Sequence, residues 1–238
     1  MLKIEHLTKK FGQKVAVDDL SLTVESGQIC AFIGHNGAGK TTTLKAIAGI
    51  FGFDDGNIFV NDIDVVKNPI EAKLNMAYLP DNPDLYEHLK GIEYLNFVAD
   101  VFNLSNSERK EKMEQYAKRL EIYNDLNSSI SSYSHGMKQK LALVSALIHS
   151  PKLLLLDEPF VGLDPISSHQ FKLIMQEMAD KGTTIFYSTH VLDVAEKICS
   201  HVAIIKEGKL IVHDTMENVK GMKSLESIFL ELSDEKHD

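Results

Sequence analysis

The amino-acid sequence predicts an α/β fold with a mostly parallel sheet, an N-terminal antiparallel β patch and a helical insertion. Two observations carry this prediction. Short apolar runs each end in glycine or a polar residue, and helical stretches separate them, which is typical of parallel strands joined by helices. A longer stretch, from about residue 93 to residue 148, has mainly helical periodicity. We therefore expect a helical insertion at about 82–150, between two parts of one core.

The length of the chain, 238 residues, allows one large domain or two small ones, and 44% hydrophobic content is ordinary for a globular protein. We expect one domain over residues 1–216, followed by a short C-terminal helix and acidic tail over 217–238. In that tail one helical face collects four apolar residues, Leu225, Ile228, Phe229 and Leu232. This face is expected to dock on the body of the same chain.

Charge and cysteine content argue against some classes of protein. The formal net charge of -9 disfavours non-specific nucleic-acid binding, which needs a basic surface. The cysteines, Cys30 and Cys199, are isolated and form no CxxC motif, as expected of buried thiols in a reducing compartment. We expect no signal peptide, and no apolar run is long enough to span a bilayer, so any role at a membrane would need a partner.

The N-terminal elements differ in pattern from the rest of the chain. Residues 3–7 and 20–27 alternate between apolar and polar side chains and lie close to turn residues, which favours antiparallel strands. The run ICAFI at 29–33 is continuously apolar and is expected to form a buried strand. A glycine-rich segment, GHNGAGKTT at 34–42, follows it and leads into a helical pattern. This order predicts a strand, a tight loop and a helix.

The segment at 34–42 fits the phosphate-loop pattern G-x-x-x-x-G-K-[ST]. Its glycines let the backbone wrap tightly, so that N–H groups point at phosphate oxygens. Lys40 is then expected to reach the β and γ phosphates, and Thr41 to offer its hydroxyl to Mg²⁺. The strand before it and the helix after it predict a P-loop NTPase core. The nucleotide-binding residues expected from this motif are Gly34, Asn36, Gly37, Ala38, Gly39, Lys40, Thr41 and Thr42.

A second signal is LLLLDEP at 153–159, where four leucines predict a buried parallel strand. In open α/β sheets, ligands bind beyond the carboxyl ends of the strands. Asp157 is therefore expected to hold Mg²⁺, directly or through water, and Glu158 to orient the attacking water or take its proton. The alternative is a strand that ends in a charged turn, which the phosphate loop elsewhere in the chain disfavours.

Two further segments complete the predicted sheet. TTIFYSTH at 183–190 ends in His190, whose neutral imidazole would lie at a carboxyl strand end and hydrogen-bond the γ-phosphate or the water. The alternative for a single histidine after a strand is a structural role. AIIKEGKLIVHD at 203–214 predicts a hairpin that turns at Glu207 and Gly208.

The order of the phosphate loop, a helix led by Ser134, LLLLDEP, GLDP and STH resembles the ATP-binding subunit of an ABC transporter. The resemblance covers the chain from Leu2 to about Val212. Three stretches look most like bacterial exporter-type cassettes, at 78–89, 133–143 and 157–165. The resemblance implies the ABC ATPase fold, binding of ATP and Mg²⁺, and ATP hydrolysis that drives transport through a separate membrane subunit.

The resemblance also implies roles for single residues. Phe11 occupies the place of an aromatic ring that stacks on adenine, and the alternative is a buried core aromatic. Ser134 and Gly136 match the signature motif of the family, in which the serine would hold the ATP bound by a second cassette. His135 and Met137 depart from that motif, which usually has glycine and glutamine at these places.

Two aspartates extend the implied site. Asp164, in GLDP, matches an aspartate that the family uses across the interface between two cassettes. Asp81 stands where the family usually has glutamine, or glutamate in some exporter-type members, and a carboxylate there can ligate Mg²⁺ or its bound water. The segment after Asp81 is expected to touch the membrane subunit through Leu85, Tyr86 and Leu89. The alternative is a solvated loop whose tyrosine packs on this chain itself.

Three functions fit parts of this pattern. The favoured one is an ATPase subunit at the cytoplasmic face of the cell membrane, attached through an integral membrane subunit and driving export. It would act as a homodimer or with a different cassette, and would bind no nucleic acid. An ABC-type ATPase acting on ribosomes or DNA usually has two cassettes in one chain or a long coiled coil, and this sequence has neither. A small-molecule phosphoryl transferase would leave the signature motif and Asp164 unexplained.

Overall fold

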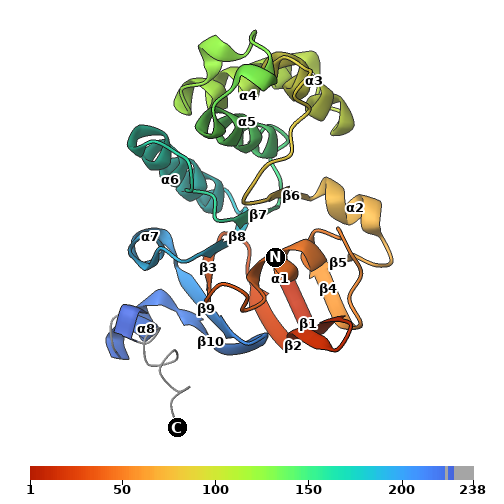
Figure 1. Ribbon diagram of the computed structural model, residues 1–238, viewed down its shortest axis with the longest axis vertical. Coiled ribbons are helices and arrows are strands. Elements are labelled where there is room, and N and C mark those ends of the chain that lie inside the picture. The colour runs from red at the N-terminus through yellow and green to blue at the C-terminus, as the bar shows by residue number, and fades with distance from the viewer. Residues whose placement is uncertain (223–224, 228–238) are drawn as a thin grey trace.

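The computed structural model describes residues 1–222 and 225–227, which form two sheets flanked by helices (Figure 1). The strands in these residues are β1 (Leu2–Phe11), β2 (Lys14–Val24), β3 (Ile29–Ile33), β4 (Asp55–Val60), β5 (Ile63–Asp64), β6 (Met76–Leu79), β7 (Leu153–Asp157), β8 (Thr184–Thr189), β9 (His201–Lys206) and β10 (Lys209–Thr215). The smaller sheet has the order β2-β1-β4-β5 and the larger one β10-β9-β3-β8-β7-β6.

The direction of the strands confirms the predicted fold class. Every neighbouring pair in the smaller sheet is antiparallel. In the larger sheet only the β9–β10 hairpin is antiparallel, and the other neighbouring pairs are parallel. The hairpin turns at Glu207 and Gly208, as its sequence predicts, and both residues have positive φ.

Helices cover the larger sheet and extend beyond it. They are α1 (Lys40–Ile47), α2 (Pro69–Leu74), α3 (Gly91–Val101), α4 (Asn106–Arg119), α5 (His135–Leu147), α6 (Pro165–Asp180), α7 (Leu192–Ile198) and α8 (Met216–Met222). Short 3-10 turns lie at Tyr123–Asp125 and Ile130–Ser132.

The larger sheet separates two hydrophobic cores. Strands β3, β7 and β8 are buried along their whole length, which explains their uninterrupted apolar sequences. Side chains of β3 alternate between the cores: Ile29 and Ala31 pack with α5 and α6, whereas Cys30 and Phe32 pack with α1 and the smaller sheet. The central strands are therefore fixed from both sides, and so are their carboxyl ends.

The helical insertion follows β6 in the chain and returns to the sheet at β7. Helices α3, α4 and α5 group at the top of the molecule, away from the smaller sheet (Figure 1). Helix α4 begins with a capping box in which Ser105 and Glu108 exchange hydrogen bonds. An ion pair of 2.6 Å between Arg119 Nη1 and Glu177 Oε2 links the end of α4 to α6.

Several short elements carry no sequence signal strong enough to predict them. Strands β4, β5 and β6 and helix α2 have two to six residues each. Strand β6 forms because Met76–Leu79 pairs with the apolar β7, a partner far along the chain. Their formation depends on tertiary contacts more than on their own pattern.

The C-terminal region is described in part. Helix α8 begins at Met216, close to the predicted end of the domain, and Leu225 is buried in the core, as expected for the apolar face of the tail. The other residues of that face, Ile228, Phe229 and Leu232, lie outside the described residues. In the described part of the chain, no helix has both the length and the apolar content to cross a membrane.

Candidate functional site

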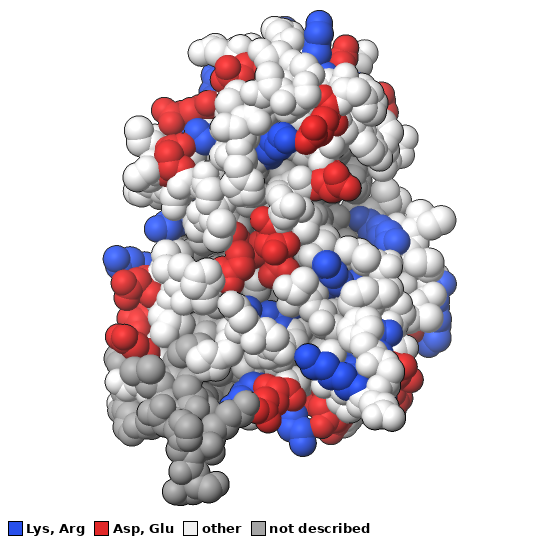
Figure 2. Space-filling model, viewed as in Figure 1, with Lys and Arg blue, Asp and Glu red and all other residues white. Residues whose placement is uncertain are grey.

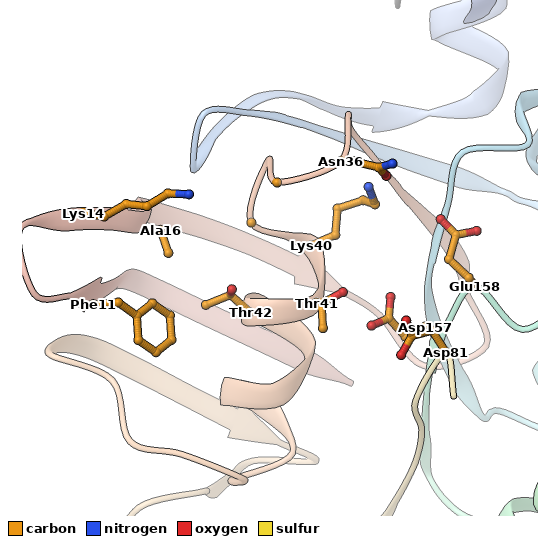
Figure 3. A pocket seen from close by; sticks show the side chains of 12 residues that line it. Phe11, Lys14, Ala16, Asn36, Lys40, Thr41, Thr42, Asp81, Asp157 and Glu158 are labelled. Atoms are coloured by element: carbon orange, nitrogen blue, oxygen red, sulfur yellow. The ribbon is translucent and has the colours of Figure 1, made fainter. Parts of the chain in front are cut away.

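A cavity of about 300 Å³ lies between the loop at 34–42 and the carboxyl end of β7 (Figure 3). It is lined by Phe11, Lys14, Ala16, Asn36, Gly37, Gly39, Lys40, Thr41, Thr42, Asp81, Asp157 and Glu158. The cavity thus brings together the phosphate loop, the acidic pair and Asp81, which are far apart in the sequence. Figure 2 shows acidic side chains gathered midway along the molecule, between the helical insertion and the sheets.

The loop at 34–42 is closely packed against the rest of the core. A Cβ on Gly34 would lie 2.5 Å from the Ile205 carbonyl oxygen, and one on Gly39 would lie 2.5 Å from the Ala16 carbonyl oxygen. Gly39 also has a φ of 112°, which L side chains rarely adopt. These glycines are therefore required where the sequence has them. Gly34 and Ala38 support the loop but are not among the cavity-lining residues.

Lys40 is folded back into the loop. Its Nζ donates hydrogen bonds to the carbonyl oxygens of Gly34 at 2.6 Å and His35 at 3.2 Å. Burial lowers the pKa of Lys40, while the nearby Glu158 and Asp157 carboxylates act in the opposite direction. The ammonium group thus lies in the field of the acidic pair, at the N-terminus of α1, where phosphate is favoured.

Asp157 ends β7 and is only 1% exposed. Its Oδ1 accepts a hydrogen bond from the Ser188 hydroxyl, but its Oδ2 is buried without a hydrogen-bond partner. A buried carboxylate oxygen left in this way is costly, so a cation at this place would be stabilising. The Thr41 hydroxyl points toward the side of the cavity where Asp81 and Asp157 lie (Figure 3). These oxygen donors fit Mg²⁺.

Glu158 follows Asp157 and turns sharply out of the strand, with a φ of 49°. Its Oε1 lies 2.9 Å from His190 Nδ1, although the two residues are 32 positions apart. His190 does not line the cavity itself, so the structure connects it to the site through Glu158. The imidazole is more exposed than the carboxylate, at 59% against 18% of the side chain.

The far end of the cavity is aromatic. Phe11 is 51% exposed at the end of β1, which excludes the alternative of a buried core aromatic. Its ring meets that of Phe51 edge-on at 5.7 Å, and Lys9 Nζ lies 5.1 Å above it. Lys14 and Ala16 also line this end, and no motif marks them. Only the hairpin, which pairs Phe11 with Lys14, could have indicated them.

Ser134 caps α5 as predicted, because its Oγ accepts a hydrogen bond from Met137 N at 3.3 Å. Neither Ser134 nor Gly136 lines the cavity. A Cβ on Gly136 would lie 2.7 Å from the Gly162 carbonyl oxygen, so this helix end packs tightly on the loop after β7. Lys138, also in α5, forms an ion pair with Glu87.

Asp164 also lies outside the cavity lining and has local partners. It is the N-cap of α6, with Oδ1 accepting from Ser167 N at 2.9 Å, and Pro165 is the first helical residue. Lys140 Nζ of α5 lies 2.6 Å from Asp164 Oδ2. The Asp-Pro pair is a helix-start signal that the sequence interpretation missed.

One expectation for the segment after Asp81 is wrong. Leu85 is 6% exposed and belongs to the hydrophobic core, so it is not a surface contact for a partner. Leu89 packs against the same core. Tyr86 is 51% exposed and remains available, beside Phe97 at 5.6 Å between ring centroids.

The known proteins to which this chain is similar point to one family. Residues 17–161 match the family model described as ABC transporter. The chain is 34% identical over 224 residues to the ABC transporter ATP-binding protein NatA of Bacillus subtilis, which covers 92% of this chain and 91% of NatA. It is 31% identical over 215 residues to the linearmycin resistance ATP-binding protein LnrL of the same organism, which covers 90% of this chain and 69% of LnrL.

A solved structure supports the same assignment. The ATP-binding subunit of an ABC transporter superimposes with a TM-score of 0.94 at 32% identity, covering 98% of this chain and 99% of that chain. The phosphate loop and the acidic strand end, which the family would need for ATP, line one cavity here. The chain therefore belongs to the ABC transporter family, as an ATP-binding subunit that hydrolyses ATP in a reaction coupled to transport.

Proposed function

We propose that the cavity of about 300 Å³ binds ATP together with Mg²⁺, and that Glu158 and His190 carry its hydrolysis. The observation that supports this proposal is that one cavity is lined by the phosphate loop and by the carboxyl end of β7. In this arrangement Phe11 stacks on the nucleobase, the N–H groups of residues 34–42 hold the phosphates, and Lys40 leaves its carbonyl partners for the β and γ phosphates.

Mg²⁺ would be held by Thr41, Asp81 and Asp157, the last through its unpartnered Oδ2. Among the described residues no group of three or more His, Cys, Asp or Glu side chains is arranged for a metal ion. The remaining ligands would then be phosphate oxygens and water, as is usual for Mg²⁺. When bound, the ion would neutralise negative charge on the phosphates.

Glu158 is proposed to take the proton of the attacking water. If His190 Nδ1–H donates to Glu158 Oε1, the contact of 2.9 Å orients the carboxylate of this cavity-lining residue. His190 thus orients the base through this contact.

The test of this function is Glu158→Gln. We expect it to bind ATP as tightly as the wild type and to hydrolyse it at least ~100-fold more slowly, because proton-transfer catalysis contributes about that much. Phosphate release at saturating Mg·ATP and calorimetric ATP binding would measure the two effects separately.

A matched control is Glu114→Gln in α4, which removes a carboxylate from an exposed ion pair with Lys118 and should keep wild-type turnover. If the turnover of Glu158→Gln lies within a few fold of that of the wild type, Glu158 is not the general base.

We infer that Ser134, Gly136 and Asp164 act on ATP bound to a second cassette, either another copy of this chain or a different one. All three lie outside the lining of the chain's own cavity. They belong to one packed unit, since α5 begins against Gly162 and is ion-paired to the start of α6. The N-terminus of α5 would supply N–H groups to a phosphate of the partner's ATP.

The second partner in this proposal is an integral membrane subunit, which holds the chain at the cytoplasmic face of the cell membrane. Tyr86, exposed beside Tyr94 and Phe97, is the contact that the structure supports. Export is the proposed direction, because the chain resembles exporter-type cassettes and a relative is named for linearmycin resistance. Binding of nucleic acid is not part of the proposal, in keeping with the net charge of -9.

A further inference from the structure

We propose that Ser188 is a positioning residue for ATP hydrolysis. Its hydroxyl holds the Asp157 carboxylate so that Oδ2 is presented to Mg²⁺, and it fixes the backbone of Glu158 at the same time. This inference rests on the proposed role of Asp157 in holding Mg²⁺. It deepens that role, because it names the group that orients the ligand.

The register of the sheet places Ser188 next to Asp157. Strands β7 and β8 are parallel, and the last pair in their register joins Asp157 to Ser188. Ser188 is 0% exposed and Asp157 is 1% exposed, so neither side chain can rely on bulk water for hydrogen bonds. The Ser188 hydroxyl must therefore find its hydrogen-bond partners within the protein, and the Asp157 carboxylate beside it is one of them.

The Ser188 hydroxyl both donates and accepts a hydrogen bond. Its Oγ donates to Asp157 Oδ1 and accepts from Glu158 N at 3.2 Å. The Ser188 carbonyl oxygen accepts from the same N–H, also at 3.2 Å. One serine therefore holds a side chain and a backbone group of the two consecutive acidic residues.

This arrangement orients the Asp157 carboxylate and supports the backbone of Glu158. Because Asp157 Oδ1 accepts the hydrogen bond from Ser188, the oxygen without a partner is Oδ2, and Asp157 lines the cavity. Glu158 has a φ of 49°, a conformation that costs energy for a non-glycine residue, and the bonds from its N–H to Ser188 help to hold it. Two residues further on, His190 contacts the Glu158 carboxylate.

The experiment compares three variants of Ser188. Ser188→Ala removes the hydroxyl, and Ser188→Cys keeps its size but donates only weakly. We expect both to raise the Mg²⁺ concentration for half-maximal ATPase activity by about tenfold or more, the usual effect of losing a partner of a metal ligand. Ser188→Thr retains the donor and should stay near the wild type in this measurement.

A second readout does not depend on activity. Calorimetric ATP affinity should fall in Ser188→Ala and Ser188→Cys when Mg²⁺ is present, and should match the wild type in EDTA. The matched control is Thr184→Val, which removes another fully buried hydroxyl at the opposite end of β8, bonded to the Glu25 carbonyl oxygen at 3.2 Å. It should leave the Mg²⁺ dependence unchanged.

Wild-type Mg²⁺ dependence in both Ser188→Ala and Ser188→Cys would overturn the inference. So would a defect in Ser188→Ala alone, because it would then arise from the cavity and not from the lost hydrogen bond. An equal loss of ATP affinity with and without Mg²⁺ would likewise count against it. If the wild type bound and hydrolysed ATP without any Mg²⁺ dependence, the proposed metal site would fail, and this inference with it.

Discussion

Asp164 is the N-cap of α6 and is also a residue that we propose to act on the ATP of a second cassette. Its Oδ1 caps the helix through Ser167 N at 2.9 Å, and its Oδ2 pairs with Lys140 at 2.6 Å. The hydrogen bond from Lys140, with further bonds from Ser167, holds the pKa of Asp164 well below its usual range. The carboxylate is therefore favoured in the fold, independently of any partner chain.

We predict that Asp164→Ala destabilises the folded chain by about 1 kcal/mol, the usual cost of losing an N-cap. A carboxyl group with a lowered pKa stabilises the fold fully above its ordinary pKa of 3.8, and this contribution is lost as the pH falls below that value. The difference between wild type and variant should therefore be constant above about pH 5 and shrink as the pH falls further. Urea unfolding at several pH values measures it.

Asp164→Asn is the control for the cap, because asparagine caps helices as well as aspartate does. It should keep most of the stability that Asp164→Ala loses at neutral pH. Equal stability of the wild type and Asp164→Ala would show that neither the cap nor the Lys140 pair contributes.

At the scale of elements, the first turn of α5 and the loop after β7 form one unit. A Cβ on Gly136 would lie 2.7 Å from the Gly162 carbonyl oxygen. A Cβ on Gly162 would in turn lie 2.7 Å from Cδ2 of the His135 ring. His135, which departs from the family's motif, thus packs against this loop. The signature segment and the start of α6 are held together by these contacts and by the Lys140–Asp164 pair.

We predict that Gly136→Ala forces the loop away from α5 and destabilises the fold by about 1–3 kcal/mol, the usual cost of an added methyl group without space. It should also weaken ATP-dependent pairing of cassettes, measured by gel filtration with ATP. Gly221→Ala in α8 is the matched control, because its Cβ would meet nothing within 4 Å, and it should cause no loss of stability. A Gly136→Ala protein as stable as the wild type would contradict the tight packing.

At the scale of the whole molecule, the cavity that we propose to bind ATP lies at the parallel sheet, whereas the segment that resembles the signature motif lies in the helical insertion. The site lies at the carboxyl ends of the central strands, which are fixed by cores on both faces. Ser134 begins α5 in the insertion and does not line that site. An arrangement of two cassettes can bring one chain's cavity to the other's signature, and a mixing experiment tests it.

We predict that Lys40→Ala and Ser134→Arg, each unable to dimerise alone, form ATP-dependent heterodimers when mixed. One interface then combines the two defects, and the other combines an intact phosphate loop with an intact signature. Energy transfer between dyes on the two variants measures association, in a Glu158→Gln background that slows hydrolysis. The prediction applies to a homodimer, so ATP-dependent self-association of the Glu158→Gln chain is measured first.

The control places both changes in one chain and mixes it with the Glu158→Gln parent. That pair carries the same two defects but has no intact interface, so it should not associate. If the parent dimerises and the mixture of single variants does not, Ser134 does not serve the partner's ATP.

Much of the site could be predicted from the sequence because its parts lie in short, continuous motifs. Residues 34–42 and the end of β7 are such motifs, and the structure places them at one cavity. Phe11 required the resemblance, since one aromatic residue has no pattern of its own. Lys14 and Ala16 were missed because only the pairing of β1 with β2 brings them to the cavity. Leu85 was assigned to the surface because an apolar residue in a loop does not reveal what covers it.

The sequence by itself determined the fold class, the central strands and the identity of the phosphate-binding loop. These features follow from local chemistry: continuous apolar runs must be buried, and the glycines of the loop permit a backbone path that other residues exclude. The tertiary structure alone decided which side chains meet. The contacts of Glu158 with His190 and of Asp157 with Ser188 join residues 32 and 31 positions apart. They exist because β7 and β8 lie in register within one sheet, and that register is set by packing along the whole length of both strands.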